Sequence, residues 1–142
     1  MKRYLSLDVG DATVGIAVSD LLGMTAQGVE TIHRSSLAND LARLKELMDQ
    51  YETKSLVLGL PKNMNGTQGE RCEVVRNFAE EIRKMVPDVE IVFWDERLST
   101  VAATRSLLEA DVSRRKRRKV IDKMAAVFIL QGFLDKLSHE KA

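Results

Sequence analysis

Residues 4–18 read YLSLDVGDATVGIAV, two short apolar runs that flank the turn signal Gly10-Asp11-Ala12. Runs of this length and type on either side of a Gly/Asp turn predict a β-hairpin. Side chains alternate along a strand, so Leu5 and Leu7 share one face and Asp8 falls on the other. If both faces of the sheet are covered, Asp8 becomes a buried acid.

Outward from the hairpin, apolar periodicity predicts the remaining elements. We expect strands within residues 3–9, 13–19 and 24–33, a helix over 37–51, a strand over 55–60, a helix capped by Thr67 and ended by Pro87, a strand over 89–94, and helices over about 99–109 and 119–137. In the helix over 37–51, Leu37 and Leu44 lie on the apolar face and Asp40 points outward. This order predicts an α/β fold whose mixed five-stranded sheet has antiparallel hairpin strands first and parallel β-α units afterwards, flanked by helices. With no linker or repeat, we expect one domain over residues 1–142.

The composition is that of a globular protein, with 142 residues, 44% hydrophobic and 30% charged. Cys72 is the only cysteine, which excludes an internal disulfide and a cysteine-rich metal cluster. Asp8 and Asp11 interrupt the N-terminus before the apolar stretch of a signal peptide can form. The longest apolar run, residues 125–130, is far too short to span a bilayer. We therefore expect a soluble cytoplasmic protein.

Charge is unevenly distributed, although the net charge is only +1. Six of the 22 basic residues are contiguous, which leaves 16 basic residues against 21 acidic ones in the rest of the chain. The basic run consists of Arg114, Arg115, Lys116, Arg117, Arg118 and Lys119. A basic stripe on an acidic body indicates a polyanionic partner held at one place. The alternative is a solvated loop that only keeps the protein soluble.

Three acids lie where the expected elements should converge. Asp8 is in the first strand, Glu96 follows the strand over 89–94, and Asp122 is in the last helix, where a spacing of four puts it on the face of Ala126. A carboxylate on the core side of its element is costly unless something pairs with it. Three such acids, far apart in sequence, suggest a shared cation.

Each acid also has an ordinary structural explanation. An aspartate near a helix start interacts favourably with the helix dipole, which would account for Asp122. An aspartate shortly before a glycine often stabilises a turn by hydrogen-bonding to the backbone, which would account for Asp8. Asp95 precedes Glu96, so either acid could point inward, and Arg97 could neutralise Asp95 in an ordinary ion pair.

Acids gathered at one place repel one another and retain protons unless a divalent ion neutralises them. Mg²⁺ or Mn²⁺ accepts carboxylate oxygens and keeps positions open for a substrate phosphate. One or two such ions can activate water and stabilise the leaving oxygen of a phosphodiester. The carboxylate pattern therefore predicts metal-assisted chemistry on a phosphate.

Four motifs are spread in order over nearly the whole chain. They are Leu7-Asp8-Val9-Gly10 followed by Val14-Gly15-Ile16-Ala17-Val18-Ser19-Asp20, then Gly59-Leu60-Pro61 with Gly66 and Gly69, then Trp94-Asp95-Glu96-Arg97-Leu98-Ser99-Thr100, and finally Asp122-Lys123-Met124-Ala125-Ala126. Together they resemble the YqgF (RuvX) family, which is similar to the Holliday junction resolvases of the RuvC type. The resemblance implies an RNase H-like fold with Asp8, Glu96 and Asp122 as catalytic, metal-binding acids. It also implies a nuclease, usually assigned to 5′-end maturation of 16S ribosomal RNA, with a role on branched DNA as an earlier suggestion.

The basic run directly precedes Asp122, so a polyanion bound there would lie beside the acids. Aromatic residues make up only 5% of the chain and none interrupts the run, which favours backbone or shape recognition of a structured RNA over base stacking. Arg97 is a candidate for stabilising transition-state charge. Lys62, Asn63 and Asn65 are candidates for phosphate contacts, with a solvated loop equally plausible. We interpret His33, His139 and Cys72 as structural or surface residues.

Three functions compete at this point. The leading one is a metal-dependent nuclease that acts on RNA, with a DNA-junction nuclease as its variant. An ATP-using kinase relative shares the Asp-x-Gly hairpin, but 142 residues leave no room for the second lobe that closes around a nucleotide. The third is a non-catalytic nucleic-acid-binding or ribosome-binding factor whose acids are structural.

Overall fold

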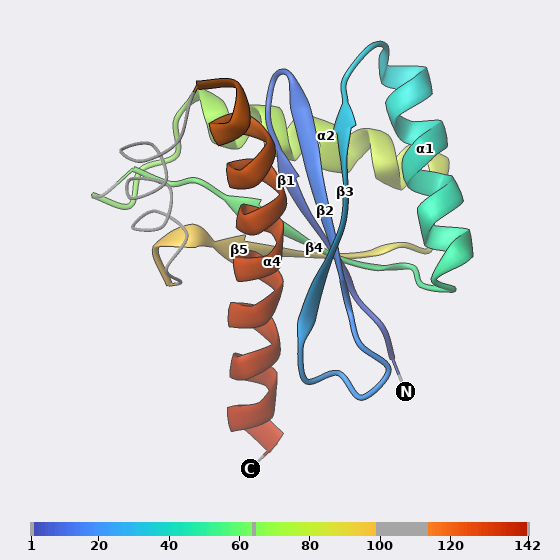
Figure 1. Ribbon diagram of the computed structural model, residues 1–142, viewed down its shortest axis with the longest axis vertical. Coiled ribbons are helices and arrows are strands. Elements are labelled where there is room, and N and C mark those ends of the chain that lie inside the picture. Colours follow the sequence, from blue (N-terminus) through green and yellow to red (C-terminus); the bar gives the residue numbers. More distant parts are fainter. Residues whose placement is uncertain (1, 64, 99–113, 142) are drawn as a thin grey trace.

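The computed structural model describes residues 2–63, 65–98 and 114–141, with the backbone alone for residues 114–123 and 141. A five-stranded sheet forms its centre (Figure 1). The strands are β1 (Leu5–Val9), β2 (Thr13–Ser19), β3 (Ala26–His33), β4 (Ser55–Leu60) and β5 (Glu90–Asp95). Their order is β3-β2-β1-β4-β5, antiparallel from β1 to β3 and parallel from β1 through β4 to β5. This confirms the mixed sheet expected from the sequence.

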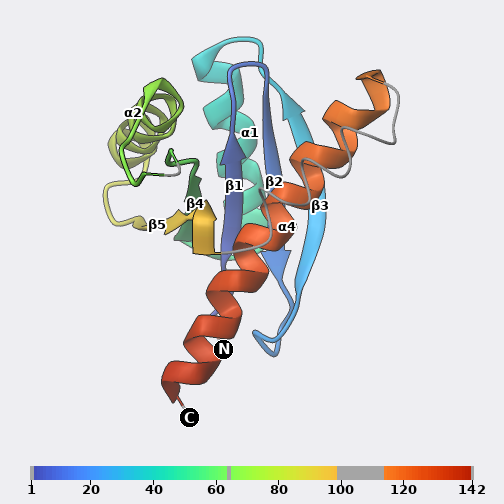
Figure 2. The ribbon, with the colours of Figure 1, turned by 90° about the vertical axis from the view of Figure 1, so that its left-hand side faces the viewer.

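Helices lie on both faces of the sheet (Figure 2). They are α1 (Leu37–Gln50), α2 (Glu70–Met85), the short 3-10 helix η1 (Glu96–Leu98) and α4 (Arg114–Lys141). α1 and α2 cover one face, and α4 crosses the other alone among the described helices (Figures 1 and 2). Among the described residues, none of these helices combines the length and the apolarity that a membrane crossing needs.

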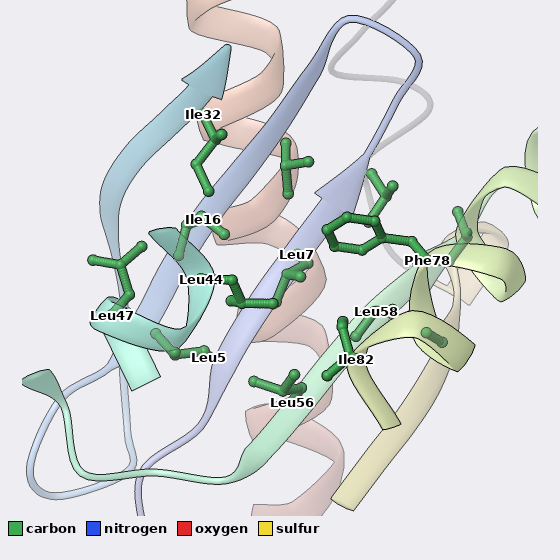
Figure 3. Close-up of a cluster of buried hydrophobic side chains, with 14 of the residues drawn as sticks. Leu5, Leu7, Ile16, Ile32, Leu44, Leu47, Leu56, Leu58, Phe78 and Ile82 are labelled. Carbon is green, nitrogen blue, oxygen red and sulfur yellow. The ribbon is translucent and has the colours of Figure 1, made fainter. Parts of the chain in front are cut away.

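The larger core lies between the sheet and the helices α1 and α2 (Figure 3). Leu5 and Leu7 of β1 have no exposed surface, and Leu44 of α1 and Phe78 of α2 pack into the same cluster. Full burial of one such side chain stabilises the fold by about 1.5–3 kcal/mol. Because these side chains fix one face of the central strand β1, its alternate positions must face α4.

α4 packs on this second face through small residues. Ala125 and Ala126 are buried against the sheet, where alanines let helix and strands approach closely. The Ser6 hydroxyl donates a hydrogen bond of 2.6 Å to the Ala126 carbonyl. Seven residues further along α4, the Phe133 ring packs edge-on against Tyr4, with 5.0 Å between centroids. α4 therefore runs antiparallel to β1, and its N-terminal part lies toward the carboxyl end of that strand.

Two expectations about helix ends are wrong. α4 begins at Arg114 rather than near residue 119, so the basic run belongs to the helix instead of preceding it. Arginine and lysine are strong helix formers, which accounts for this extension. Thr67 does not cap α2. Gly69 occupies the N-cap position without a side-chain bond, and the Thr67 hydroxyl instead donates to Asn65 Oδ1 at 2.7 Å.

Two expectations about α1 are also wrong. Asp40 is buried, with only 2% of its surface exposed, because the Arg34 side chain binds its carboxylate. Leu37 is 41% exposed because it stands at the first position of the helix, at the margin of the core. The expected helix over 99–109 lies outside the described residues.

Candidate active site

Asp8 is a buried acid on the face of β1 that α4 covers. Its exposed fraction is 7%, and it pairs with Gly15 across the hairpin. Ser6, two residues earlier, points to α4, so the alternation of a strand places Asp8 on the same side. The turn that follows is closed by the Gly10 N–H, which donates to the Thr13 carbonyl at 2.9 Å. Asp8 thus belongs to the strand and not to the turn.

The neighbouring acids Asp95 and Glu96 occupy different environments. Arg97 binds the Asp95 carboxylate through its Nε and Nη2 groups, the latter at 2.7 Å, and its backbone N–H donates to Oδ1 at 3.0 Å. These hydrogen bonds hold the pKa of Asp95 below its usual value. Glu96 is 6% exposed. Arg97 thus forms the ion pair with Asp95 that was the alternative to a role in the chemistry, and Glu96 is the acid that points inward.

Glu96 lies over β4 on the side of the sheet that faces α4. A Cβ built on Gly59 would stand 3.1 Å from Glu96 Oε2 and would also meet Ile129 of α4. β1, β4 and β5 lie side by side in this order and run parallel, so their carboxyl ends lie at one end of the sheet. Asp8, in β1, and Glu96, directly after β5, are therefore two buried carboxylates on the same face and at the same end of the sheet, with β4 between their strands.

Asp122 lies in α4 four residues before Ala126, and its side chain is outside the described part of the structure. The position of its backbone along β1 follows from the geometry of the helix. Four helical residues advance about 6 Å, close to the advance from Ser6 to Asp8 along β1. Because Ser6 contacts Ala126, the Asp122 backbone lies toward the Asp8 end of β1. Among the side chains that the structure describes, no group of three or more His, Cys, Asp or Glu residues gathers as a metal site.

A loop after β4 borders this edge of the sheet. Asn63 accepts from the Gly66 N–H at 2.8 Å and donates through Nδ2 to Thr67 at 3.0 Å, so the loop is internally hydrogen-bonded. Arg97 packs on Gly66, where a Cβ would lie 3.3 Å from its Nη1 atom. Lys62 Nζ lies 4.0 Å from the Asp95 carboxylate. Two cations, from Lys62 and Arg97, thus stand at Asp95, the residue before Glu96.

The residues expected to be structural occupy such positions. Cys72 is buried in the larger core, and His33 and His139 are exposed. Asp20 accepts from the Met24 N–H at 2.8 Å, which lowers the pKa of its carboxyl and makes it a turn residue. Sequence reasoning missed the role of Gly59, although a glycine inside a strand often marks the close approach of another group.

The profile of the RuvX family, described as Holliday junction resolvase, matches residues 2–136. The chain belongs to the RuvX family. A relative from Clostridium botulinum (strain Hall), named "Putative pre-16S rRNA nuclease", is 57% identical over 136 residues, 96% of this chain and 98% of the relative. Relatives with the same name from Staphylococcus carnosus and Clostridium tetani are 56% and 53% identical, over 95% and 94% of this chain and 96% of each relative.

Solved structures place the RuvX chain in a known fold. Thermus thermophilus RuvC in complex with a Holliday junction substrate aligns with a TM-score of 0.60 at 13% identity, covering 96% of each chain. A second T. thermophilus RuvC structure aligns with a TM-score of 0.58 at 10% identity and the same coverage. At these identities the likeness establishes the fold, which is RNase H-like as the sequence motifs imply.

Proposed function

We propose that this RuvX-family protein is a metal-dependent nuclease that hydrolyses phosphodiester bonds, with Asp8, Glu96 and Asp122 as its catalytic acids. The observation that carries the proposal is the burial of Asp8 and Glu96 on one face and at the same end of the sheet, on either side of β4. Asp122 joins them as the acid of α4, the helix that covers this face. We take residues 1–142 as one nuclease domain that works in the cytoplasm.

The two described carboxylates fit a hard divalent cation. Burial of ionised carboxylates is costly unless positive charge compensates it, and Mg²⁺ or Mn²⁺ prefers oxygen ligands of this type. When bound, the metal would activate a water molecule and stabilise the leaving oxygen. The protein holds the acids in place, Asp8 within the central strand β1 and Glu96 in η1. Arg97 binds the neighbouring Asp95, so that Glu96 is the carboxylate at the site.

Pre-16S ribosomal RNA is the substrate that we propose. The curated relatives carry that substrate in their names, at 53–57% identity over nearly the full chain. The basic residues of this chain are suited to a nucleic-acid backbone, because arginine and lysine bind phosphates without reading sequence. We assign this role to Arg97, Arg114, Arg115, Lys116, Arg117, Arg118 and Lys119.

A four-way DNA junction is the second candidate substrate. The family description and the fold shared with a junction-bound RuvC favour it. The basic residues do not distinguish the two substrates, because phosphate contacts are common to RNA and DNA.

A cleavage assay tests both candidates. Purified protein is offered a precursor of 16S ribosomal RNA and a four-way DNA junction, with Mg²⁺ or Mn²⁺ and with EDTA. We expect metal-dependent cleavage of the RNA that Asp8→Asn reduces at least 100-fold, since loss of even an outer-shell partner of a metal typically costs about 10–100-fold. Asp49→Asn, at an exposed site on α1, is the matched control and should retain activity.

The outcomes separate the functions. Selective cleavage of the junction would show that the substrate is branched DNA and not RNA. Unchanged cleavage in Asp8→Asn would refute the assignment of the acids. Binding that persists in EDTA without cleavage of either substrate would indicate a non-catalytic factor.

A further inference from the structure

Gly59 lies where β4, α4 and Glu96 meet. Across the sheet it pairs with Trp94 of β5, and the next step of the β1–β4 register brings Asp8 alongside it. Its backbone has an ordinary strand conformation within β4. Glycine is therefore needed at this position because there is no room for a side chain, and not because of its backbone conformation.

A side chain at Gly59 would collide with two partners. A Cβ would lie 2.4 Å from Ile129 Cδ1 and 3.1 Å from Glu96 Oε2. The first contact is impossible unless Ile129, which has no exposed surface, or α4 itself moves. The second is tighter than most contacts of a real Cβ, so the Glu96 carboxylate must give by a few tenths of an ångström.

We propose that Gly59 is a positioning residue that sets the spacing of the candidate acids. Because Gly59 has no side chain, the Glu96 carboxylate and α4 can both pack closely against β4. A methyl group there displaces Glu96 and lifts the helix that carries Asp122, so both acids shift relative to Asp8. This inference rests on the proposed function, because it assumes that the three acids act together.

The two contacts can be separated by mutation. Ile129→Val removes Cδ1, the atom nearest to the new methyl group, and leaves Glu96 unchanged. The double variant Gly59→Ala/Ile129→Val therefore removes the 2.4 Å collision with α4 and leaves Ile129 Cγ1 and Glu96 Oε2, each 3.1 Å from the new methyl group. A purely structural role for Gly59 predicts that Tm and metal affinity recover together, whereas a positioning role predicts that Tm recovers and metal affinity does not.

Two measurements on the full chain distinguish the roles. Thermal unfolding gives Tm, and Mn²⁺ titration followed by fluorescence of Trp94, the only tryptophan and the strand partner of Gly59, gives metal affinity. We expect Gly59→Ala to lower both. In the double variant we expect Tm to recover in part, while Mn²⁺ binds about tenfold or more weakly than to Ile129→Val alone, as for other residues that orient metal ligands.

Equal Mn²⁺ affinity in the double variant and in Ile129→Val would overturn the proposal. If the double variant does not fold, the same comparison is made between Gly59→Ala/Ile129→Ala and Ile129→Ala, since alanine removes both carbons near the new methyl group. A failure of the proposed function has a different result. In that case the unaltered protein binds no Mn²⁺, or Glu96→Gln binds it equally well, and the inference about Gly59 falls with it.

Discussion

Asp95 and Glu96 are consecutive carboxylates that have different partners and different exposure. Asp95 is neutralised at the surface by Arg97, with Lys62 nearby, while Glu96 is buried over β4. An exposed ion pair of this kind contributes little to stability. Its value here is geometric, because Arg97 binds Asp95 through both backbone and side chain and so fixes the turn that contains Glu96.

The lowered pKa of Asp95 gives a pH dependence with a definite sign. The stabilisation is complete above the usual carboxyl pKa, 3.8, and is lost as the pH falls through the lower folded-state value. The difference in unfolding free energy between the unaltered protein and Asp95→Asn should therefore be constant from about pH 7 to about pH 5 and shrink below about pH 4. Urea denaturation across this range measures it. A difference that keeps its full size in strong acid would contradict the assigned ion pair.

At the scale of elements, the β1–β2 turn is tied to α1 by an ion pair between the half-buried Arg34 and the buried Asp40. Arg34 donates through Nη1 to the Gly10 carbonyl at 2.9 Å and through Nε to Asp40 at 3.2 Å. The Ser35 N–H also donates to Asp40. The carboxyl end of β1, and with it Asp8, is thereby held from the opposite side of the sheet.

Loss of Asp40 should cost far more than loss of a surface acid. Asp40→Ala leaves the half-buried Arg34 without its partner, and we expect it to lower the unfolding free energy by about 3 kcal/mol. Asp49 pairs with Lys45, four residues earlier on the exposed face of α1, so Asp49→Ala should lower the unfolding free energy by less than about 0.5 kcal/mol. Chemical denaturation of both variants provides the comparison. Similar losses would show that the buried pair does not anchor the turn.

The elements themselves could be predicted from the sequence because their periodicity is local. β1, β2 and β4 follow from short apolar runs, and their pairing follows from the hairpin and the β-α order. The burial of Asp40 could not be predicted, because it depends on Arg34 folding back from the preceding loop. The choice of Glu96 over Asp95 likewise depends on Arg97, and the role of Gly59 depends on Ile129 of α4, which comes 70 residues later in the chain.

For the molecule as a whole, charge is concentrated at one end of α4. The six basic residues now lie in the first turns of this helix, which extend toward the end of the sheet that carries Asp8 and away from the C-terminus (Figure 1). The remainder of the chain has an excess of acidic residues. Such a distribution favours a polyanion at this end and opposes one elsewhere.

The salt dependence of RNA binding tests this distribution. Replacement of Arg114, Arg115 and Lys116 by glutamine should weaken binding and reduce the slope of log K against log salt by about 0.7–0.9 for each phosphate that the protein no longer neutralises. Lys54→Gln, directly before β4 and at the opposite end of its strand from the candidate acids, is the control and should leave the slope unchanged. Filter binding with Asp8→Asn as the background separates binding from cleavage. An unaltered slope in the triple variant would exclude the basic run as the binding surface.

The most direct test of the proposed metal site is anomalous diffraction from crystals of the protein soaked in Mn²⁺. We predict an anomalous peak between the carboxylates of Asp8 and Glu96, on the side of the sheet that α4 covers, with an Asp122 oxygen as a further ligand. The peak should disappear in Asp8→Asn crystals treated in the same way. A peak located elsewhere, or one that persists in Asp8→Asn, would contradict the assignment of these acids as the metal-binding centre.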